Sequence, residues 1–520
     1  MTAASMLRRP GFGWAVVTVV VAVLVAPVVG SSPVRAAPAV TAVGSWSMVS
    51  LVKDANGDGF IDGDGGVPAA GALSLDPSTR LVGAGNFIAQ PHERLIGGAL
   101  SWYLEDAGYP VELNACRSRG TRYSWAITDS AGSPVVSTRP RALGKKTCRR
   151  SVLLPEGSYT ARLTVTSLGA KSTVTVPLTV QNLLMVVLGD SYASGEGNPR
   201  NIEAWLRSGG IFTGFRPYWD DEPCRRSVHG GAAQAALALE QASARTSVTL
   251  VDVSCSGATI DAGILGPQTS AGQTTSQIEQ VRSIIGSRPI DLVSLTVGGN
   301  DVGFTSILTS CATKANCPVQ PASTRPLTGF PTLQDGAQAR IAALPGAYAR
   351  VAACLGGTSC ALAGPGQDAA LPLSPGAAVL PTLYPDITRA ASGGPCTYLT
   401  MDAQDFRWAR DTLLVPSPSP SYAYTLTTGR TVPLSVAAGT LNSQVVATAG
   451  LGWRPVTGAW EASGDSTTGH GVCAGSQAWV FGLTALAGFA NASFHPNPAG
   501  QRTLGQAIAA AAQAALANPR

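Results

Sequence analysis

The sequence predicts an α/β domain over residues 182–520, preceded by a small all-β sandwich over residues 38–181. Two patterns lead to this prediction. From Leu183 onward, continuously apolar segments alternate with helical stretches, which is typical of a parallel sheet covered on both faces. Before that point, apolar and polar residues alternate with a period of two, which is typical of half-buried antiparallel strands. A chain of 520 residues is long enough to build both.

The composition indicates a folded protein and excludes some partners. Hydrophobic residues make up 45% of the chain and charged residues only 13%, which is a globular rather than a disordered composition. The formal net charge is +5, and no basic stripe or zinc-finger spacing accompanies it. We therefore expect no nucleic-acid partner, and we expect a monomer.

Residues 1–37 have the pattern of a secretory signal peptide. A basic start with Arg8 and Arg9 precedes a long apolar run, and small residues follow near Ala36 and Ala37. A retained membrane anchor is the alternative, because the apolar run is nearly long enough to span a bilayer. The signal peptide predicts a secreted, extracellular protein.

The all-β region is expected to contain strands at residues 122–128, 158–167 and 171–180. Trp125 should lie in its core, and Pro177 should lie on an edge strand or at a bulge. The stretch LPEGSYTARLTV at residues 154–165 resembles the strand-turn-strand of immunoglobulin-like and PKD-like modules. Such a module could attach the protein to a cell surface or a polymer.

A short acidic stretch in this region is a candidate calcium site. Asp54, Asn56 and Asp58 alternate and Gly59 follows, which matches the start of a calcium-binding loop. Position twelve of that loop is Gly65 rather than a glutamate. A structural calcium ion and a solvated acidic turn both remain open.

The ten cysteines are expected to form disulfides, because the chain carries an export signal. A zinc site is the alternative, but the sequence has no CxxC pair and only four histidines. The order of the cysteines along the chain suggests local pairs, namely Cys116–Cys148, Cys224–Cys255, Cys311–Cys317, Cys354–Cys360 and Cys396–Cys473.

The α/β region should contain strands at residues 183–188, 247–253, 291–297 and 376–384. Helices are expected at residues 230–243, 275–286, 336–355, 432–450 and 499–518. In such sheets a functional site lies beyond the carboxyl ends of the strands.

Small polar residues follow three of these strands. Ser191 follows the first in Gly-Asp-Ser, Gly257 the second, and Asn300 the third. Each alone could be an ordinary tight turn. Together with His495, which precedes the last helix, they supply what acyl transfer needs: a serine nucleophile and a histidine base. The backbone N–H groups of Ser191 and Gly257 and the Asn300 amide would form an oxyanion hole.

The blocks GDSYASGEG, CSGA, GGNDVGF and FHPNPAGQ resemble the SGNH hydrolase superfamily, also called GDSL esterases and lipases. The secreted actinobacterial branch is the most similar, and the match covers residues 183–520. The resemblance implies a flavodoxin-like α/β/α fold and ester hydrolysis without a catalytic metal or cofactor. It assigns Ser191 and His495 as catalytic and Ser191, Gly257 and Asn300 as the oxyanion hole.

The chain departs from this family at Ala492, where an acidic residue usually stands three positions before the histidine. We therefore predict a Ser191–His495 dyad in which the Ala492 main-chain carbonyl accepts a hydrogen bond from His495 Nδ1. A carboxylate from another loop is the rival.

The predicted function is a secreted serine esterase or lipase that acts on acyl lipids or small acyl esters. The alternatives are a polysaccharide O-acyl or acetyl esterase and an inactive binding protein of the same fold. Acyl-chain length is not encoded in the motifs, because loops build the cleft.

Overall fold

The computed structural model describes residues 39–52, 54, 57, 59–61, 108–207, 215–357, 359–362, 369–458, 469–483 and 490–518. The predicted signal peptide, residues 1–37, lies outside them. Val40–Arg520 forms one compact unit. Within the described part, no helix is both long enough and apolar enough to cross a bilayer.

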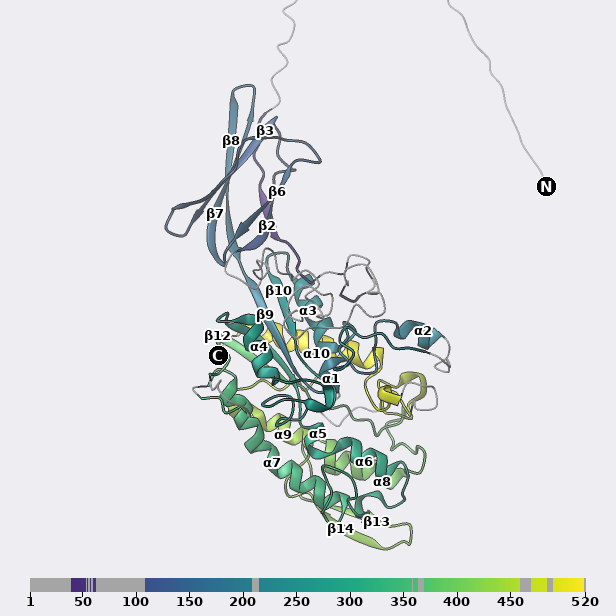
Figure 1. Ribbon diagram of the computed structural model, residues 1–520. Coiled ribbons are helices and arrows are strands. Elements are labelled where there is room, and N and C mark those ends of the chain that lie inside the picture. Colours follow the sequence, from purple (N-terminus) through teal and green to yellow (C-terminus); the bar gives the residue numbers. More distant parts are fainter. Residues whose placement is uncertain are drawn as a thin grey trace, which may run out of the picture. The chain divides into compact units, whose positions relative to one another are not determined.

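The core of the α/β region is a four-stranded parallel sheet (Figure 1). Its strands are β9 (Asn182–Gly189), β10 (Ser247–Asp252), β11 (Ile290–Thr296) and β12 (Leu373–Pro381), in the order β10-β9-β11-β12. Every residue of β9 and β10 is buried. Continuous apolar runs form these strands because helices cover both sides of the sheet.

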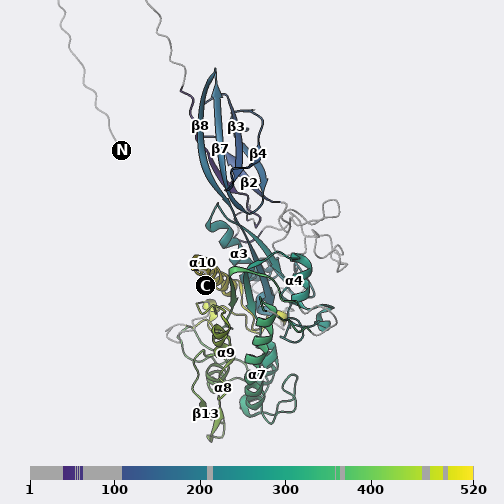
Figure 2. The same cartoon turned by 90° about the vertical axis from the view of Figure 1, so that its left-hand side faces the viewer.

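Helices flank this sheet (Figure 2). On one side α3 (Gly231–Ala242) packs against α10 (Pro498–Ala517). On the other side lie α4 (Gln277–Ile285) and α7 (Leu333–Cys354). The α/β class predicted from the sequence is therefore the class of this region.

Shorter elements complete the α/β region. They are α1 (Ser191–Ser194), α2 (Ile202–Arg207), α5 (Gly299–Val302), α6 (Phe304–Cys311), α8 (Ala403–Ala409), β13 (Ser421–Thr425), β14 (Thr431–Ser435) and α9 (Leu441–Ala447). The helix expected at residues 432–450 is therefore only partly correct. Its first residues pair with β13 in an antiparallel hairpin, and the helix begins after the Thr440 cap.

The described residues of the amino-terminal region form two antiparallel sheets. One has the order β1-β2-β6, from β1 (Ser45–Met48), β2 (Tyr109–Asn114) and β6 (Arg149–Leu154). The other has the order β4-β3-β7-β8, from β3 (Arg122–Asp129), β4 (Pro134–Ser137), β7 (Gly157–Ser167) and β8 (Ala170–Val180), with β5 (Arg141–Ala142) on β3. Trp125 is buried and Pro177 lies on the edge strand β8, both as expected. A separate domain over residues 38–181 stays a prediction.

The candidate calcium loop is described in part. Asp54 accepts hydrogen bonds from the backbone N–H groups of Gly57 and Gly59, at 2.7 and 3.0 Å. Asn56 and Asp58 lie outside the described residues. No cluster of three or more histidine, cysteine or acidic side chains suited to a metal occurs in the described ranges. Calcium binding stays a prediction.

All ten cysteines are paired. The disulfides are Cys116–Cys148, Cys224–Cys255, Cys311–Cys317, Cys354–Cys360 and Cys396–Cys473, the same pairs that the sequence order suggests. Cys255 directly precedes the Ser256–Gly257 turn, so its bond to Cys224 anchors that turn.

Candidate active site

Ser191 lies at the start of α1, directly beyond the end of β9. The turn requires glycine at position 189, whose φ is +140° and where a Cβ would lie 2.2 Å from the Thr296 carbonyl oxygen. Asp190 caps the helix, because its side chain accepts a hydrogen bond from Tyr192 N–H at 3.0 Å. The turn thereby holds Ser191 at the edge of the sheet.

Ser191 opens onto a cavity of about 570 Å³ that also contains His495 and Asn300. Three of the four predicted site residues, distant in sequence, therefore line one cavity. Much of the remaining lining is apolar and comes from Phe304, Leu308, Ala312, Leu399, Leu483 and Phe494.

Gly257 lines a smaller, neighbouring cavity of about 280 Å³, and Asn300 lines both cavities. Gly257 has φ +79°, a conformation that glycine adopts without strain. Its backbone N–H donates no hydrogen bond within the described part of the chain. Asn300 Nδ2 donates to the Ala258 carbonyl oxygen at 3.0 Å. Because an amide nitrogen carries two hydrogens, this bond orients the group and leaves one hydrogen for a ligand.

His495 is held by a main-chain carbonyl, although not the predicted one. Its Nδ1 lies 3.1 Å from the carbonyl oxygen of Ser493. The Ala492 carbonyl instead accepts the backbone N–H of His495, also at 3.1 Å. The prediction was thus wrong by one residue. The tight turn uses the carbonyl three positions back for its own backbone bond, which leaves the next carbonyl to meet the imidazole.

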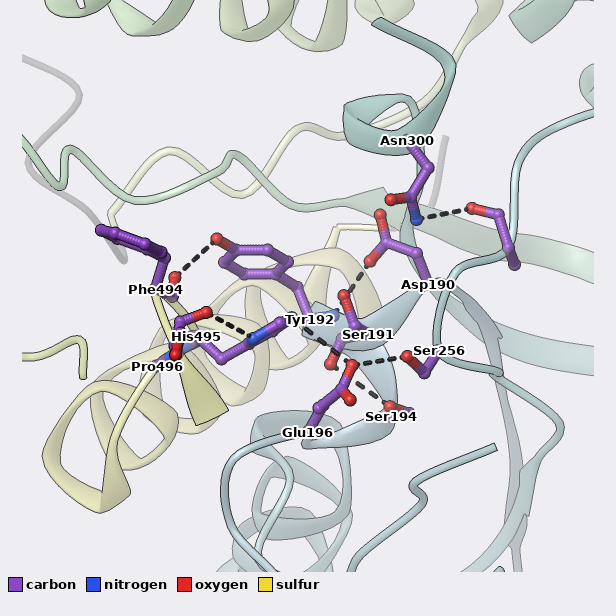
Figure 3. A network of polar contacts seen from close by, with 12 residues as sticks. Asp190, Ser191, Tyr192, Ser194, Glu196, Ser256, Asn300, Phe494, His495 and Pro496 are labelled. Atoms are coloured by element: carbon purple, nitrogen blue, oxygen red, sulfur yellow. Dashed lines mark hydrogen bonds and ion pairs between the residues drawn. The ribbon is translucent and has the colours of Figure 1, made fainter. Parts of the chain in front are cut away.

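The other ring nitrogen of His495 faces a carboxylate that the sequence reasoning missed. His495 Nε2 lies 3.5 Å from Glu196 Oε2, and Figure 3 shows Glu196 extending toward His495 and Ser256. Glu196 is 5% exposed and lines the cavity. Among the described residues, no hydrogen bond joins His495 Nε2 to Ser191. The signal was present in the sequence, because Glu196 is the acid of GDSYASGEG.

A buried tyrosine was also missed. The Tyr384 hydroxyl donates a hydrogen bond to Asp190 and accepts one from Gly299 N–H at 2.9 Å. Asp190 is 1% exposed. Burial raises the pKa of Asp190 to about 7, although the hydrogen bond from Tyr384 opposes the shift. Tyr384 follows β12, so nothing close in sequence connects it to Asp190.

Tyr192 directly follows Ser191 and supports the histidine. Its hydroxyl donates to the Phe494 carbonyl oxygen at 2.9 Å. Its ring lies against the His495 imidazole, with centroids 5.2 Å apart. The Tyr192 side chain therefore packs against the residue expected to act as the base.

His470, the other histidine near the carboxyl terminus, is not among the described cavity residues. Its ring stacks on Trp479 at a centroid distance of 3.7 Å, and its Nδ1 lies 2.7 Å from the Gln477 carbonyl oxygen. These contacts give His470 a structural role.

No protein-family model matches this chain, and no curated protein sequence does. Among solved structures, the chain is similar to LAE5, an alpha/beta hydrolase enzyme from the metagenome of Lake Arreo, with 13% identity, 64% of this chain and 96% of that one covered, and a TM-score of 0.28. It is also similar to a carbohydrate acetylesterase family member from Sinorhizobium meliloti, with 10% identity, coverage of 64% and 99%, and a TM-score of 0.27. Likenesses with TM-scores of 0.28 and 0.27 assign no activity to this chain.

Proposed function

We propose that this protein is a secreted serine hydrolase that cleaves carboxylic esters through an acyl-enzyme intermediate. The observation that carries the proposal is the shared cavity of Ser191, His495 and Asn300. A serine at a strand-to-helix turn, an imidazole with a fixed tautomer and a side-chain amide are the groups that acyl transfer uses.

The carbonyl of Ser493 fixes the tautomer of the proposed base, His495. A carbonyl oxygen can only accept, so the neutral imidazole carries its hydrogen on Nδ1 and leaves a lone pair on Nε2. In the proposed reaction Nε2 takes the proton of Ser191 Oγ as the oxygen attacks the ester carbonyl. The imidazolium then gives this proton to the departing alcohol. Water then attacks the acyl-enzyme, with His495 again taking a proton and returning it to Ser191 Oγ. This second step releases the carboxylic acid.

Ser191 and His495 form no hydrogen bond in the free protein, so this step requires their contact to tighten when substrate binds. Such bonds are often long in unliganded active sites. The negative oxygen of the tetrahedral intermediate would accept hydrogen bonds from the N–H groups of Ser191 and Gly257 and from the Asn300 amide. Loss of one such donor typically costs about 100- to 1000-fold in rate.

The apolar side chains of the cavity favour an acyl group as the part of the substrate that enters it. We propose acyl lipids or small acyl esters as substrates. A polysaccharide O-acyl or acetyl esterase is the alternative, and it predicts a preference for the shortest acyl groups. Rates on p-nitrophenyl esters of increasing chain length decide between the two.

The proposal includes the setting in which the enzyme works. The signal-peptide pattern and the paired cysteines support export to an oxidising compartment. We propose a monomer that needs no cofactor for catalysis and has no nucleic-acid partner. The amino-terminal β-strands would bind a cell surface or a polymer. Calcium would stabilise the loop that contains Asp54.

Fluorophosphonate labelling tests the proposal, because the probe reacts with an activated serine. Wild-type protein should be labelled, whereas Ser191→Ala should fold, escape labelling and lose ester hydrolysis by several orders of magnitude. Ser194→Ala is the matched control, since Ser194 lies in the same short helix and is not among the cavity residues. A Ser191→Ala variant that keeps half of the wild-type rate would exclude Ser191 as the nucleophile.

A further inference from the structure

We infer that Glu196 is a positioning residue that stabilises the His495 imidazolium in place of the acid missing at position 492. This inference rests on the proposed function, because it concerns the base of the same reaction. It assigns the role to a carboxylate on the Nε2 side of the ring. That carboxylate comes from the loop that follows the nucleophile, rather than from the loop that carries the histidine.

The surroundings of Glu196 are unusual for a carboxylate. Its side chain is 7% exposed, and within the described residues its ion-pair partner is His495, at 3.5 Å, with no lysine or arginine beside it. A buried charge without a permanent counter-charge costs stability. The cost is offset when His495 is protonated, which happens in each catalytic cycle.

Two hydrogen bonds tie Glu196 to the centre of the site. Its backbone N–H donates to the Ser191 carbonyl oxygen at 3.1 Å. Its Oε2 accepts a hydrogen bond from the Ser256 hydroxyl. Ser256 is itself fixed, because its carbonyl oxygen accepts from Gln268 Nε2 at 2.6 Å. The carboxylate is thus tied to the nucleophile turn and to the residue before Gly257 (Figure 3).

The charge acts when the proton moves. Before the reaction the imidazole is neutral and has little attraction for the carboxylate. Once Nε2 accepts the proton of Ser191 Oγ, a positive ring lies next to the negative Glu196. The carboxylate therefore stabilises the charged state more than the resting state, and such selective stabilisation raises kcat.

Three variants separate charge from shape. Glu196→Gln keeps the size and can still accept from Ser256, but it removes the charge. Glu196→Asp keeps the charge on a shorter side chain. Glu203→Gln removes an exposed acid of α2, which pairs with Arg207 at 3.9 Å, and serves as the control.

For wild type and each variant, kcat and KM are measured on a soluble p-nitrophenyl ester, and folding is checked by thermal unfolding. We expect Glu196→Gln to lower kcat about 10- to 1000-fold, the usual effect of a neighbouring opposite charge, with KM changed by less than about threefold. Glu196→Asp should keep more activity than Glu196→Gln, and Glu203→Gln should match wild type.

A folded Glu196→Gln variant with a kcat within about twofold of wild type would overturn the inference. Glu196→Gln as active as Glu196→Asp, or more active, would also overturn it, because shape and not charge would then matter. Failure of the proposed function looks different: wild-type protein would neither hydrolyse the ester nor react with fluorophosphonate.

Discussion

The hydroxyl of Tyr384, three residues beyond the edge strand β12, donates a hydrogen bond to Asp190, the residue directly before Ser191. The same hydroxyl oxygen accepts the Gly299 N–H, directly before Asn300. One buried side chain thus joins the turn that carries the proposed nucleophile to the turn that carries a proposed oxyanion donor. Both turns follow parallel strands, and Tyr384 fixes their separation.

Tyr384→Phe should lower both activity and stability. The substitution leaves Asp190 and the Gly299 N–H without this partner in a buried site, which typically costs about 1–3 kcal/mol in the free energy of unfolding. Because Ser191 and Asn300 then lose their common support, kcat should fall as well. Urea unfolding and steady-state kinetics measure the two effects.

Tyr424→Phe is the control for this substitution. Tyr424 is also buried and donates to an aspartate, Asp405, at 2.7 Å, but neither residue is among those described around the cavity. It should lose a similar amount of stability and keep its kcat. Equal losses of kcat in both variants would show that Tyr384 acts only through stability.

Gly257→Ala should reduce ester hydrolysis strongly. The φ of +79° at this position strains any residue with a Cβ, and relaxation would turn the backbone N–H away from the site. Gly272→Ala is the control, because it introduces the same backbone strain: φ is +68° there and nothing lies within 4 Å of a new Cβ. Comparable activity of the two variants would argue against Gly257 in the oxyanion hole.

Removal of the Cys224–Cys255 disulfide should impair both stability and catalysis. With a sequence separation of 31 between the two cysteines, the loop-entropy estimate is about 3–4 kcal/mol. Because Cys255 precedes Ser256 and Gly257, the double substitution Cys224→Ala and Cys255→Ala should also lower kcat. The Cys354–Cys360 pair closes a loop of sequence separation 6 at the end of α7, and its removal should spare kcat.

Glu240 should make stability fall as pH rises. Burial raises its pKa from 4.5 to about 7, so the folded protein holds this proton more tightly than the unfolded chain does. The stabilisation is complete below the unfolded value and is lost as pH rises toward about 7, with a slope of at most about 1.4 kcal/mol per pH unit. When urea unfolding is measured across this pH range, the free energy of unfolding should decrease less for Glu240→Gln than for wild type. Parallel curves would contradict the assignment.

Much of the site could be read from the sequence, because the motifs are local. The Gly-Asp-Ser turn, the glycine at position 257 and Asn300 each lie within a few residues of the end of a strand, and parallel strands bring their carboxyl ends to one edge of a sheet. The helix at residues 432–450 was only half right, because Val432–Ser435 pairs with β13. An apolar run of this length fits a strand or a helix until its partner is known.

The sequence by itself determined the α/β class and the order of the site residues, because both depend on local periodicity or on short blocks. The order of the cysteines suggested the disulfides, and the structure contains the same pairs. Only the tertiary structure decided which groups meet His495. Ser493 replaced Ala492 because the turn uses the Ala492 carbonyl for its own backbone hydrogen bond. Glu196 and Tyr384 joined the site because loop and strand packing carries them there, and no sequence period records a contact between residues as far apart as Glu196 and His495.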